Sequence, residues 1–218
     1  MNVSSSIDQA ALTDSGRFWE RYAQAFVQAL EGTEVSDENG RLAYPEALGR
    51  VRDWLVQAQH DHKKVMIIGN GGSAAVASHM AIDFWKNGGI RALTFNEGAT
   101  LTCVSNDYCY EEVFAVPIQH FGDAGDIVMC ISSSGGSENI LRGARAARAK
   151  GARVITLSGF QPDNALRQLG DLNFYVPSHS YGFVETLHQF LIHSMLDIKL
   201  FQADHMDVYH RNLPMGEK

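Results

Sequence analysis

The stretch that most constrains the fold runs from Lys63 to Asp83, where an apolar segment leads into a glycine-rich turn and then a helix pattern. Val65 to Ile68 is short and uniformly apolar, which is typical of a strand buried on both faces of a sheet. Gly69 to Ser73 follows, and Ala74 to Trp85 has the pattern of a helix. Glycines permit a tight turn and close approach of a ligand, which then faces the free amides of the first helical turn. The stretch therefore predicts a bound phosphate or another anion at this turn.

Three other interpretations of this turn are available. It could be a strand-to-helix turn with no ligand, because glycine-rich turns are common punctuation. The phosphate loop of nucleoside triphosphatases needs Lys-Ser or Lys-Thr after its last glycine, which this turn lacks. The dinucleotide fingerprint fits at Gly69, Gly71 and Ala74, but its acidic ribose ligand should follow about 20 residues on. The nearest candidate, Glu97, comes 28 residues after Gly69, so we favour a phosphate over a dinucleotide.

Strand patterns alternate with helix patterns along the rest of the chain. The expected strands are 65–68, 92–95, 127–131, 154–157 and 172–176, and the expected longer helices are 14–30, 44–59, 74–85, 138–150 and 182–201. Shorter helical pieces are expected at 100–105, 111–121 and 163–168. Such alternation is typical of right-handed crossovers and a parallel sheet covered on both faces. We therefore expect an α/β fold: a single doubly wound domain with a five-stranded parallel sheet.

The first 61 residues are expected to form a helical segment of their own, since both helices precede the first strand. They cannot be crossovers, so we expect them to pack on one side of the sheet or against another subunit. Residues 32–40 are polar and acidic and are expected to form a loop. The α/β domain is expected over 62–202, with loose tails at 1–13 and 203–218.

Composition excludes several classes of partner. The 218 residues carry a formal charge of −7, which disfavours nucleic acid and anionic membranes because both need a basic patch. No stretch approaches the ~18 consecutive apolar residues of a membrane-spanning helix, and the N-terminus lacks the features of a signal peptide. The three cysteines have no metal-type spacing. We expect a soluble, cytoplasmic protein.

A second ligand-type loop follows the strand expected at 127–131. It reads Ser132, Ser133, Ser134, Gly135, Gly136 and Ser137. Hydroxyls and a helix N-terminus can hold a phosphate monoester without lysine or arginine. Serines also cap helices, which is the alternative. Because parallel strands end at one edge of the sheet, both loops should meet there, and we favour a shared phosphate cradle.

Ionisable residues cluster in two helix patterns. His79 and Asp83 stand four apart, hence on one helix face. Glu185, His188 and His193 lie among apolar residues of the last helix. A buried ionisable group must be paired, hydrogen-bonded or metal-bound, so a core histidine or an ion pair on a helix face is the simpler interpretation of each alone. Taken together, they suit a zinc-like site.

One restriction applies to that site. Glu185 and His193 are eight residues apart, so their backbones are separated by roughly 12 Å along the helix. Both cannot easily lie about 2 Å from one ion. Either one of them binds directly, or copies of the helix from neighbouring subunits contribute. We favour an interfacial site.

From Tyr44 to Leu200 the chain resembles the sugar isomerase (SIS) domain and, within it, the sedoheptulose-7-phosphate isomerase (phosphoheptose isomerase) family. The resemblance rests on motifs that occur in the expected order: GNGGSAAVASHMAIDF from Gly69, SNDYCYEEVF from Ser105, ISSSGGSENI from Ile131, RVITLSGF from Arg153 and VPSHSYGFVETLHQFLIH ending at His193.

The resemblance implies specific roles for residues. The phosphate would be held by Ser73, Ser132, Ser133, Ser134 and Ser137, and the sugar by Asn70, Gly71 and Asp107. The metal and acid–base residues fall on His79, Asp83, Glu185 and His193. Zinc or another divalent metal is the implied cofactor. The resemblance also implies a homotetramer with active sites between subunits.

Three positions depart from the family pattern. Asp83 replaces a glutamate, Glu185 replaces a glutamine, and Phe183 replaces an arginine. A carboxylate at position 185 would add a negative charge beside the metal and the substrate, tighten the binding of a divalent cation and could alter the preferred sugar.

The sequence thus predicts a metal-dependent aldose–ketose isomerase that converts sedoheptulose 7-phosphate to a heptose 7-phosphate through an enediolate. Asp83 and His193 are the expected proton-transfer pair, and His79 and Glu185 the expected metal support. Two alternatives stay open: a non-catalytic phosphosugar-binding or regulatory protein, since fold alone does not fix function, and an isomerase of another phosphorylated sugar.

Overall fold

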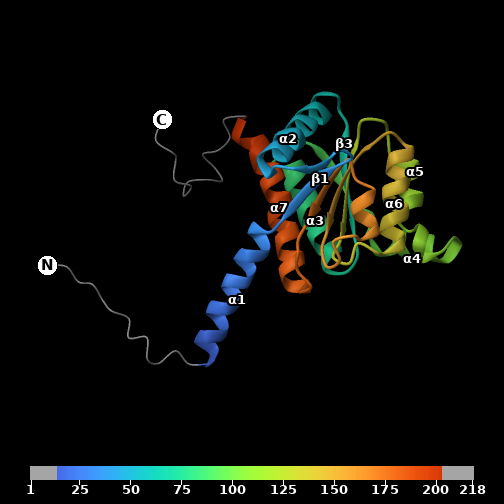
Figure 1. Cartoon of the computed structure of the whole chain (residues 1–218). Helices are drawn as coiled ribbons and strands as arrows, with labels where there is room; N and C mark the ends of the chain where they lie inside the picture. The colour runs from blue at the N-terminus through green and yellow to red at the C-terminus, as the bar shows by residue number, and fades with distance from the viewer. Residues whose placement is uncertain (1–13, 203–218) are drawn as a thin grey trace.

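Five parallel strands make up most of a seven-stranded sheet in the computed structural model, which describes residues 14–202 (Figure 1). The strands are β1 (Glu34–Asp37), β2 (Gly40–Leu42), β3 (Lys64–Gly69), β4 (Arg91–Leu93), β5 (Ile127–Ser132), β6 (Arg153–Ser158) and β7 (Leu172–Tyr175). Their order across the sheet is β2-β1-β7-β6-β5-β3-β4. The predicted α/β class and parallel strands are confirmed. The tails expected at 1–13 and 203–218 lie outside the described residues.

Helices cover both faces of this sheet (Figure 1). They are α1 (Asp14–Glu31), α2 (Tyr44–His60), α3 (Gly72–Lys86), α4 (Gly98–Asp107), α5 (Ala115–Phe121), α6 (Glu138–Ala149) and α7 (Tyr181–Gln202), with short 3₁₀ turns η2 (Tyr110–Glu112) and η3 (Ala165–Gln168). The helix expected over 111–121 is divided between η2 and α5. Pro117 lies in the first turn of α5, where its missing N–H costs no helical hydrogen bond.

The loop expected over residues 32–40 is instead part of a β-hairpin. Val35 is 2% exposed, and β1 pairs antiparallel with both β2 and β7 at the edge of the sheet. A short strand with one buried side chain has too little apolar character to be recognised in a polar sequence. The hairpin is held by two salt bridges: the carboxylate of Glu34 lies 2.6 Å from the guanidinium of Arg167, and that of Asp37 lies 2.7 Å from the guanidinium of Arg50.

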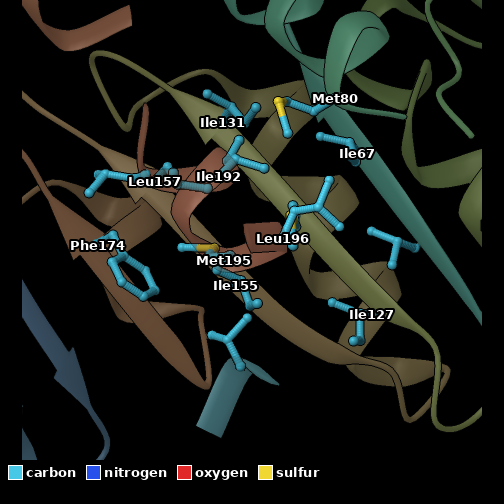
Figure 2. Close-up of a cluster of buried hydrophobic side chains, with 14 of the residues drawn as sticks. Ile67, Met80, Ile127, Ile131, Ile155, Leu157, Phe174, Ile192, Met195 and Leu196 are labelled. Atoms are coloured by element: carbon cyan, nitrogen blue, oxygen red, sulfur yellow. The ribbon is translucent and has the colours of Figure 1, made fainter. Parts of the chain in front are cut away.

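Each face of the sheet has its own apolar core. One core contains side chains of α2, α3 and α7, and the other contains side chains of α4, α5 and α6. Figure 2 shows the first core, where Ile192, Met195 and Leu196 of α7 meet Ile155 and Leu157 of β6. Burial of these large side chains, at about 25 cal/mol per Å² of apolar surface, holds α7 against the sheet.

The two N-terminal helices differ in how they pack. α2 buries Val51 and Leu55 completely, and the hydroxyl of Tyr44 lies 2.7 Å from that of Ser194 on α7. α1 leads away from the sheet in Figure 1, and its Phe18 and Trp19 are 64% and 66% exposed. Within residues 14–202, no helix combines the length and apolar character needed to cross a bilayer.

A buried carboxylate joins β3 to β5 at the edge opposite the ligand-type loops. Asp126 is 0% exposed and accepts the backbone N–H groups of Lys64, over 3.0 Å, and Asp123, over 2.8 Å. It also pairs with the ammonium of Lys64 over 2.7 Å. The carboxylate therefore satisfies three donors that otherwise have little access to water.

We predict that Asp126→Ala lowers the free energy of unfolding by about 3–5 kcal/mol, because it leaves two amides without their acceptor and the partly buried Lys64 ammonium with only the exposed Asp123 carboxylate as partner. Urea titration of the purified protein measures this change. Asp123→Ala is the matched control: that side chain is 67% exposed, so its pairing with Lys64 should contribute less than about 1 kcal/mol. Equal losses in the two variants would contradict the prediction.

Candidate functional site

The strand order places the two ligand-type loops side by side. β3 and β5 are adjacent and parallel, with Gly69 opposite Ile131, yet the chain leaves them toward opposite edges of the sheet. Open α/β sheets bind ligands in the crevice outside the carboxyl ends of the strands at such a switch point. The loops after β3 and β5 are the two for which the sequence predicts a shared phosphate cradle.

A hollow of about 220 Å³ lies between these loops. Its lining contains the predicted phosphate and sugar residues apart from Asp107, together with the start of α7: Asn70, Gly71, Gly72, Ser73, Ile131, Ser132, Ser133, Ser134, Ser137, Tyr181 and Glu185. No lysine or arginine is part of this lining, so any anion bound there is held by hydroxyls and backbone amides.

Glycines are required at two places in these loops. A Cβ on Gly69 would lie 2.6 Å from backbone atoms of Ser73, so the first loop can turn this tightly only with glycine there. Gly135 has a φ of +63°, and a Cβ there would lie 2.0 Å from the side chain of Asn164. Glycine at these two positions lets the backbone of both loops pass close to its neighbours beside the hollow.

The serines of the second loop line the hollow, and the Oγ atoms of Ser132 and Ser134 accept the loop's own N–H groups of Gly135 and Gly136. Ser137 occupies the N-cap position of α6 but makes no side-chain capping bond, and its Oγ lies 3.4 Å from Oγ of Ser132. Ser133 is 6% exposed, and its hydroxyl has no partner among the described residues. A buried hydroxyl without a partner is costly, so it is available for a ligand oxygen.

Sequence reasoning missed the residue that ties the loops together. The side-chain amides of Asn70 and Asn139 form two reciprocal hydrogen bonds of 2.9 Å, and Asn139 is 3% exposed. The hydroxyl of Tyr110 also donates to Asn70, over 3.3 Å. An asparagine in the first turn of a helix that follows a serine loop was the available signal, because a buried amide needs partners.

His79, Asp83 and His193 come together between α3 and α7. Each offers one ligand atom, and these atoms lie within 4.8 Å of one another. Nε2 of His79 is 3.2 Å, and Nδ1 of His193 is 3.9 Å, from the same carboxylate oxygen of Asp83. Two imidazoles and a carboxylate are donors that zinc prefers, and three protein ligands leave a position open as in catalytic sites. The residues fit a divalent metal.

Glu185 lies apart from this cluster, one turn into α7. Its carboxylate packs against Gly72 at the start of α3, where a Cβ would lie 2.3 Å from Oε2. It also borders a second hollow of about 410 Å³, lined by Gly72, Ala75, Val76, His79, Glu185, Thr186 and Gln189. The hollow between the loops therefore continues to His79 along the seam between α3 and α7.

Asp107 and His188 lie away from the cluster of His79, Asp83 and His193. Asp107 ends α4, where its carboxylate bonds to Asn106 and Cys103, and it lines neither hollow. His188 is 0% exposed in α7, with Nε2 3.1 Å from the carbonyl oxygen of Ser158 and Nδ1 without a partner among the described residues. Burial lowers the pKa of His188 to about 4, against a small opposing effect of the Ser158 carbonyl.

Comparison with known proteins identifies the family to which this chain belongs. The sequence model of the SIS domain matches residues 43–159, more than half of the 218 residues. The chain belongs to the SIS-domain family.

Relatives of this SIS-domain protein point to one branch of the family. The phosphoheptose isomerase of Halorhodospira halophila is 34% identical over 187 residues, which cover 82% of this chain and 92% of the relative. That of Thiobacillus denitrificans is 35% identical over 151 residues, which cover 66% and 77%. The solved phosphoheptose isomerase of Neisseria gonorrhoeae has a TM-score of 0.72 at 27% identity, and the match covers 86% of this chain and 98% of that one. The predicted resemblance to phosphoheptose isomerases is confirmed.

The buried His188 predicts a pH dependence of stability. Its folded-state pKa of about 4 lies below the ordinary value of 6.5, so between these values the unfolded chain binds a proton that the folded chain does not. Stability is therefore lost as the pH falls from 6.5 toward 4, by up to about 3 kcal/mol from this group. Urea unfolding across this range should show a shallower pH slope in His188→Leu than in the wild type. Identical slopes would contradict the assigned cause.

Proposed function

We propose that this protein is a sugar-phosphate isomerase that interconverts sedoheptulose 7-phosphate and a heptose 7-phosphate. The observation that carries the proposal is the pairing of a neutral cradle, containing the unpartnered hydroxyl of Ser133, with a nearby cluster of two histidines and a carboxylate. The names of its relatives among the phosphoheptose isomerases support the same reaction.

The cradle would hold the phosphate group. Ser73 and the hydroxyls of Ser132, Ser133, Ser134 and Ser137 would bind its oxygens, together with amides at the starts of α3 and α6. Asn70 and Gly71 would contact the sugar, and Asp107 stays a prediction because it lines neither hollow. Binding the phosphate at one end of the groove would leave the carbonyl end of the sugar near His79.

Asp83 and His193 would carry out proton transfer. One removes the proton from the carbon beside the carbonyl, and the electron pair of that C–H bond moves the negative charge onto the carbonyl oxygen, which gives an enediolate. The other passes a proton from the neighbouring hydroxyl oxygen to the former carbonyl oxygen. The proton then returns at the neighbouring carbon, so the carbonyl moves by one position. Their ligand atoms lie 3.9 Å apart, and an imidazole is able to give or take a proton near neutral pH.

His79, Asp83 and His193 would also hold a divalent metal, with zinc the preferred candidate. Such an ion polarises a carbonyl and stabilises the negative charge that develops on its oxygen. In one chain Glu185 lies outside this donor group, as the helix spacing predicts. Its proposed contribution as a ligand therefore comes from a neighbouring subunit, or it contacts the substrate directly.

A homotetramer with active sites between subunits is part of the proposal. The support is α1, whose Phe18, Trp19 and Tyr22 are 64%, 66% and 41% exposed on a helix that leads away from the sheet (Figure 1). A hollow of about 470 Å³ lies between this helix and Phe183. Exposed aromatic side chains on this scale are typical of an interface between subunits. A strictly monomeric protein with full activity would contradict the interfacial site. The predicted cytoplasmic location belongs to the same proposal.

A non-catalytic phosphosugar-binding protein is the second candidate. It is favoured by the 3.2 Å contact between Nε2 of His79 and the carboxylate of Asp83, which needs no metal to be stable on a helix surface. It predicts that the cradle binds a sugar phosphate without converting it. An isomerase of another phosphorylated sugar would use the same residues, and a panel of sugar phosphates separates it from the first candidate.

We predict that His193→Ala lowers kcat for sedoheptulose 7-phosphate by about 10²–10⁴-fold, which is the usual contribution of a general acid or base. KM should change little, because the phosphate cradle is intact. His120→Ala is the matched control, since that histidine is exposed on α5 at the other face of the sheet. Retained turnover in His193→Ala would remove this residue from the mechanism.

We predict that the purified protein contains a stoichiometric divalent metal, and that Asp83→Ala loses most of it because the central carboxylate of the donor group is gone. Elemental analysis after extensive dialysis measures the content, and chelation should abolish turnover. Asp123→Ala, an exposed carboxylate on another surface, should retain the metal. Equal metal content in both variants would overturn the assignment.

A further inference from the structure

The peptide group between Ser158 and Gly159 connects the interior of α7 to the cradle. Its carbonyl oxygen lies 3.1 Å from Nε2 of His188, and its N–H donates to the carbonyl oxygen of Ser133 over 3.0 Å. A peptide group is planar, so the direction of its carbonyl sets the direction of its N–H. The contact with His188 is therefore transmitted to Ser133, which carries the unpartnered hydroxyl of the cradle.

The packing around this peptide leaves it little freedom. The N–H of Val176 donates to the same carbonyl oxygen over 2.9 Å, so this oxygen is held from two sides. A Cβ on Gly159 would lie 2.8 Å from a methyl group of Val184, which shows how closely α7 approaches. A small movement of this helix therefore displaces the peptide and, with it, Ser133.

A buried imidazole at position 188 costs more free energy of folding than an apolar side chain of similar size would. His188 is 0% exposed, and its Nδ1 has no hydrogen-bond partner among the described residues. A leucine would occupy similar space without a buried polar atom to leave unsatisfied. What leucine cannot supply is the Nε2–H that reaches the carbonyl of Ser158.

We propose that His188 is a positioning residue for phosphate binding. Its Nε2–H orients the Ser158–Gly159 peptide, which holds the Ser133 carbonyl and thereby fixes the position of Ser133 in the lining of the cradle. This role rests on the proposed function, because it assumes that the cradle receives the phosphate of the substrate.

Two substitutions at one position separate positioning from packing. His188→Leu fills the core but removes the donor, whereas His188→Gln places an amide N–H at a similar reach from the backbone. Leu55→Ala is the control for general destabilisation, since Leu55 is fully buried in α2 near the amino ends of the strands. The probe is inorganic phosphate, titrated by calorimetry into the purified full chain.

We expect His188→Leu to weaken phosphate binding about tenfold, the value of one hydrogen bond to a charged group. KM for the sugar phosphate should rise with little change in kcat. His188→Gln should retain most of the affinity for phosphate. Leu55→Ala should lower Tm but leave the affinity for phosphate unchanged. Wild-type affinity in His188→Leu, or an equal loss in Leu55→Ala, would overturn the proposal.

Hydrogen exchange at the Gly159 amide tests the positioning independently of any ligand. The amide is protected by its bond to Ser133, so it should exchange faster in His188→Leu than in the wild type and His188→Gln. Unchanged exchange would refute the positioning role. A wild-type chain that binds no phosphate, with exchange as expected here, would contradict the proposed function instead and restrict His188 to orienting the loop.

Discussion

The site depends above all on the parallel pairing of β3 with β5. Gly69 lies opposite Ile131 in this pairing, so the two strands deliver their loops to one point at the sheet edge. The amide pair of Asn70 and Asn139 then fixes the loops to each other through two hydrogen bonds of 2.9 Å. At the opposite edge, Asp126 joins the same two strands through buried contacts. Every feature of the cradle follows from this register.

The proposed reaction also needs acid–base groups near the cradle, and the seam between α3 and α7 provides them. His79 and Asp83 share one face of α3, and His193 reaches them from α7 because that helix is pressed onto the sheet by the core in Figure 2. The cradle lining contains no basic residue, while Glu185 adds a carboxylate at its edge. The carboxylate of Glu185 thus lies where the hollow between the loops meets the hollow along the seam.

Much of this arrangement could be predicted from the sequence. The parallel strands and both serine and glycine loops have strong local patterns, and the spacing of Glu185 and His193 already showed that one helix cannot bring both to a single ion. The hairpin of β1 and β2 could not be predicted, because only Val35 is buried in a polar segment. The bond of His188 was also beyond reach, since it depends on a contact between residues far apart in sequence. For Asn139 the sequence offered its place in the first helical turn after a serine loop but did not identify Asn70 as its partner. The position of Asp107, outside both hollows, depends on how α4 ends rather than on its motif.

The most direct test of the account is to incubate the purified full chain with sedoheptulose 7-phosphate in deuterated water and to analyse the product by NMR. The account predicts a heptose 7-phosphate that carries deuterium on the carbon next to its carbonyl, because the proton removed by the protein exchanges with solvent before it returns. Binding without conversion would contradict the isomerase and favour a phosphosugar-binding protein. Conversion in which that carbon carries only hydrogen transferred from the neighbouring carbon of the substrate would contradict the exchange of the removed proton with solvent.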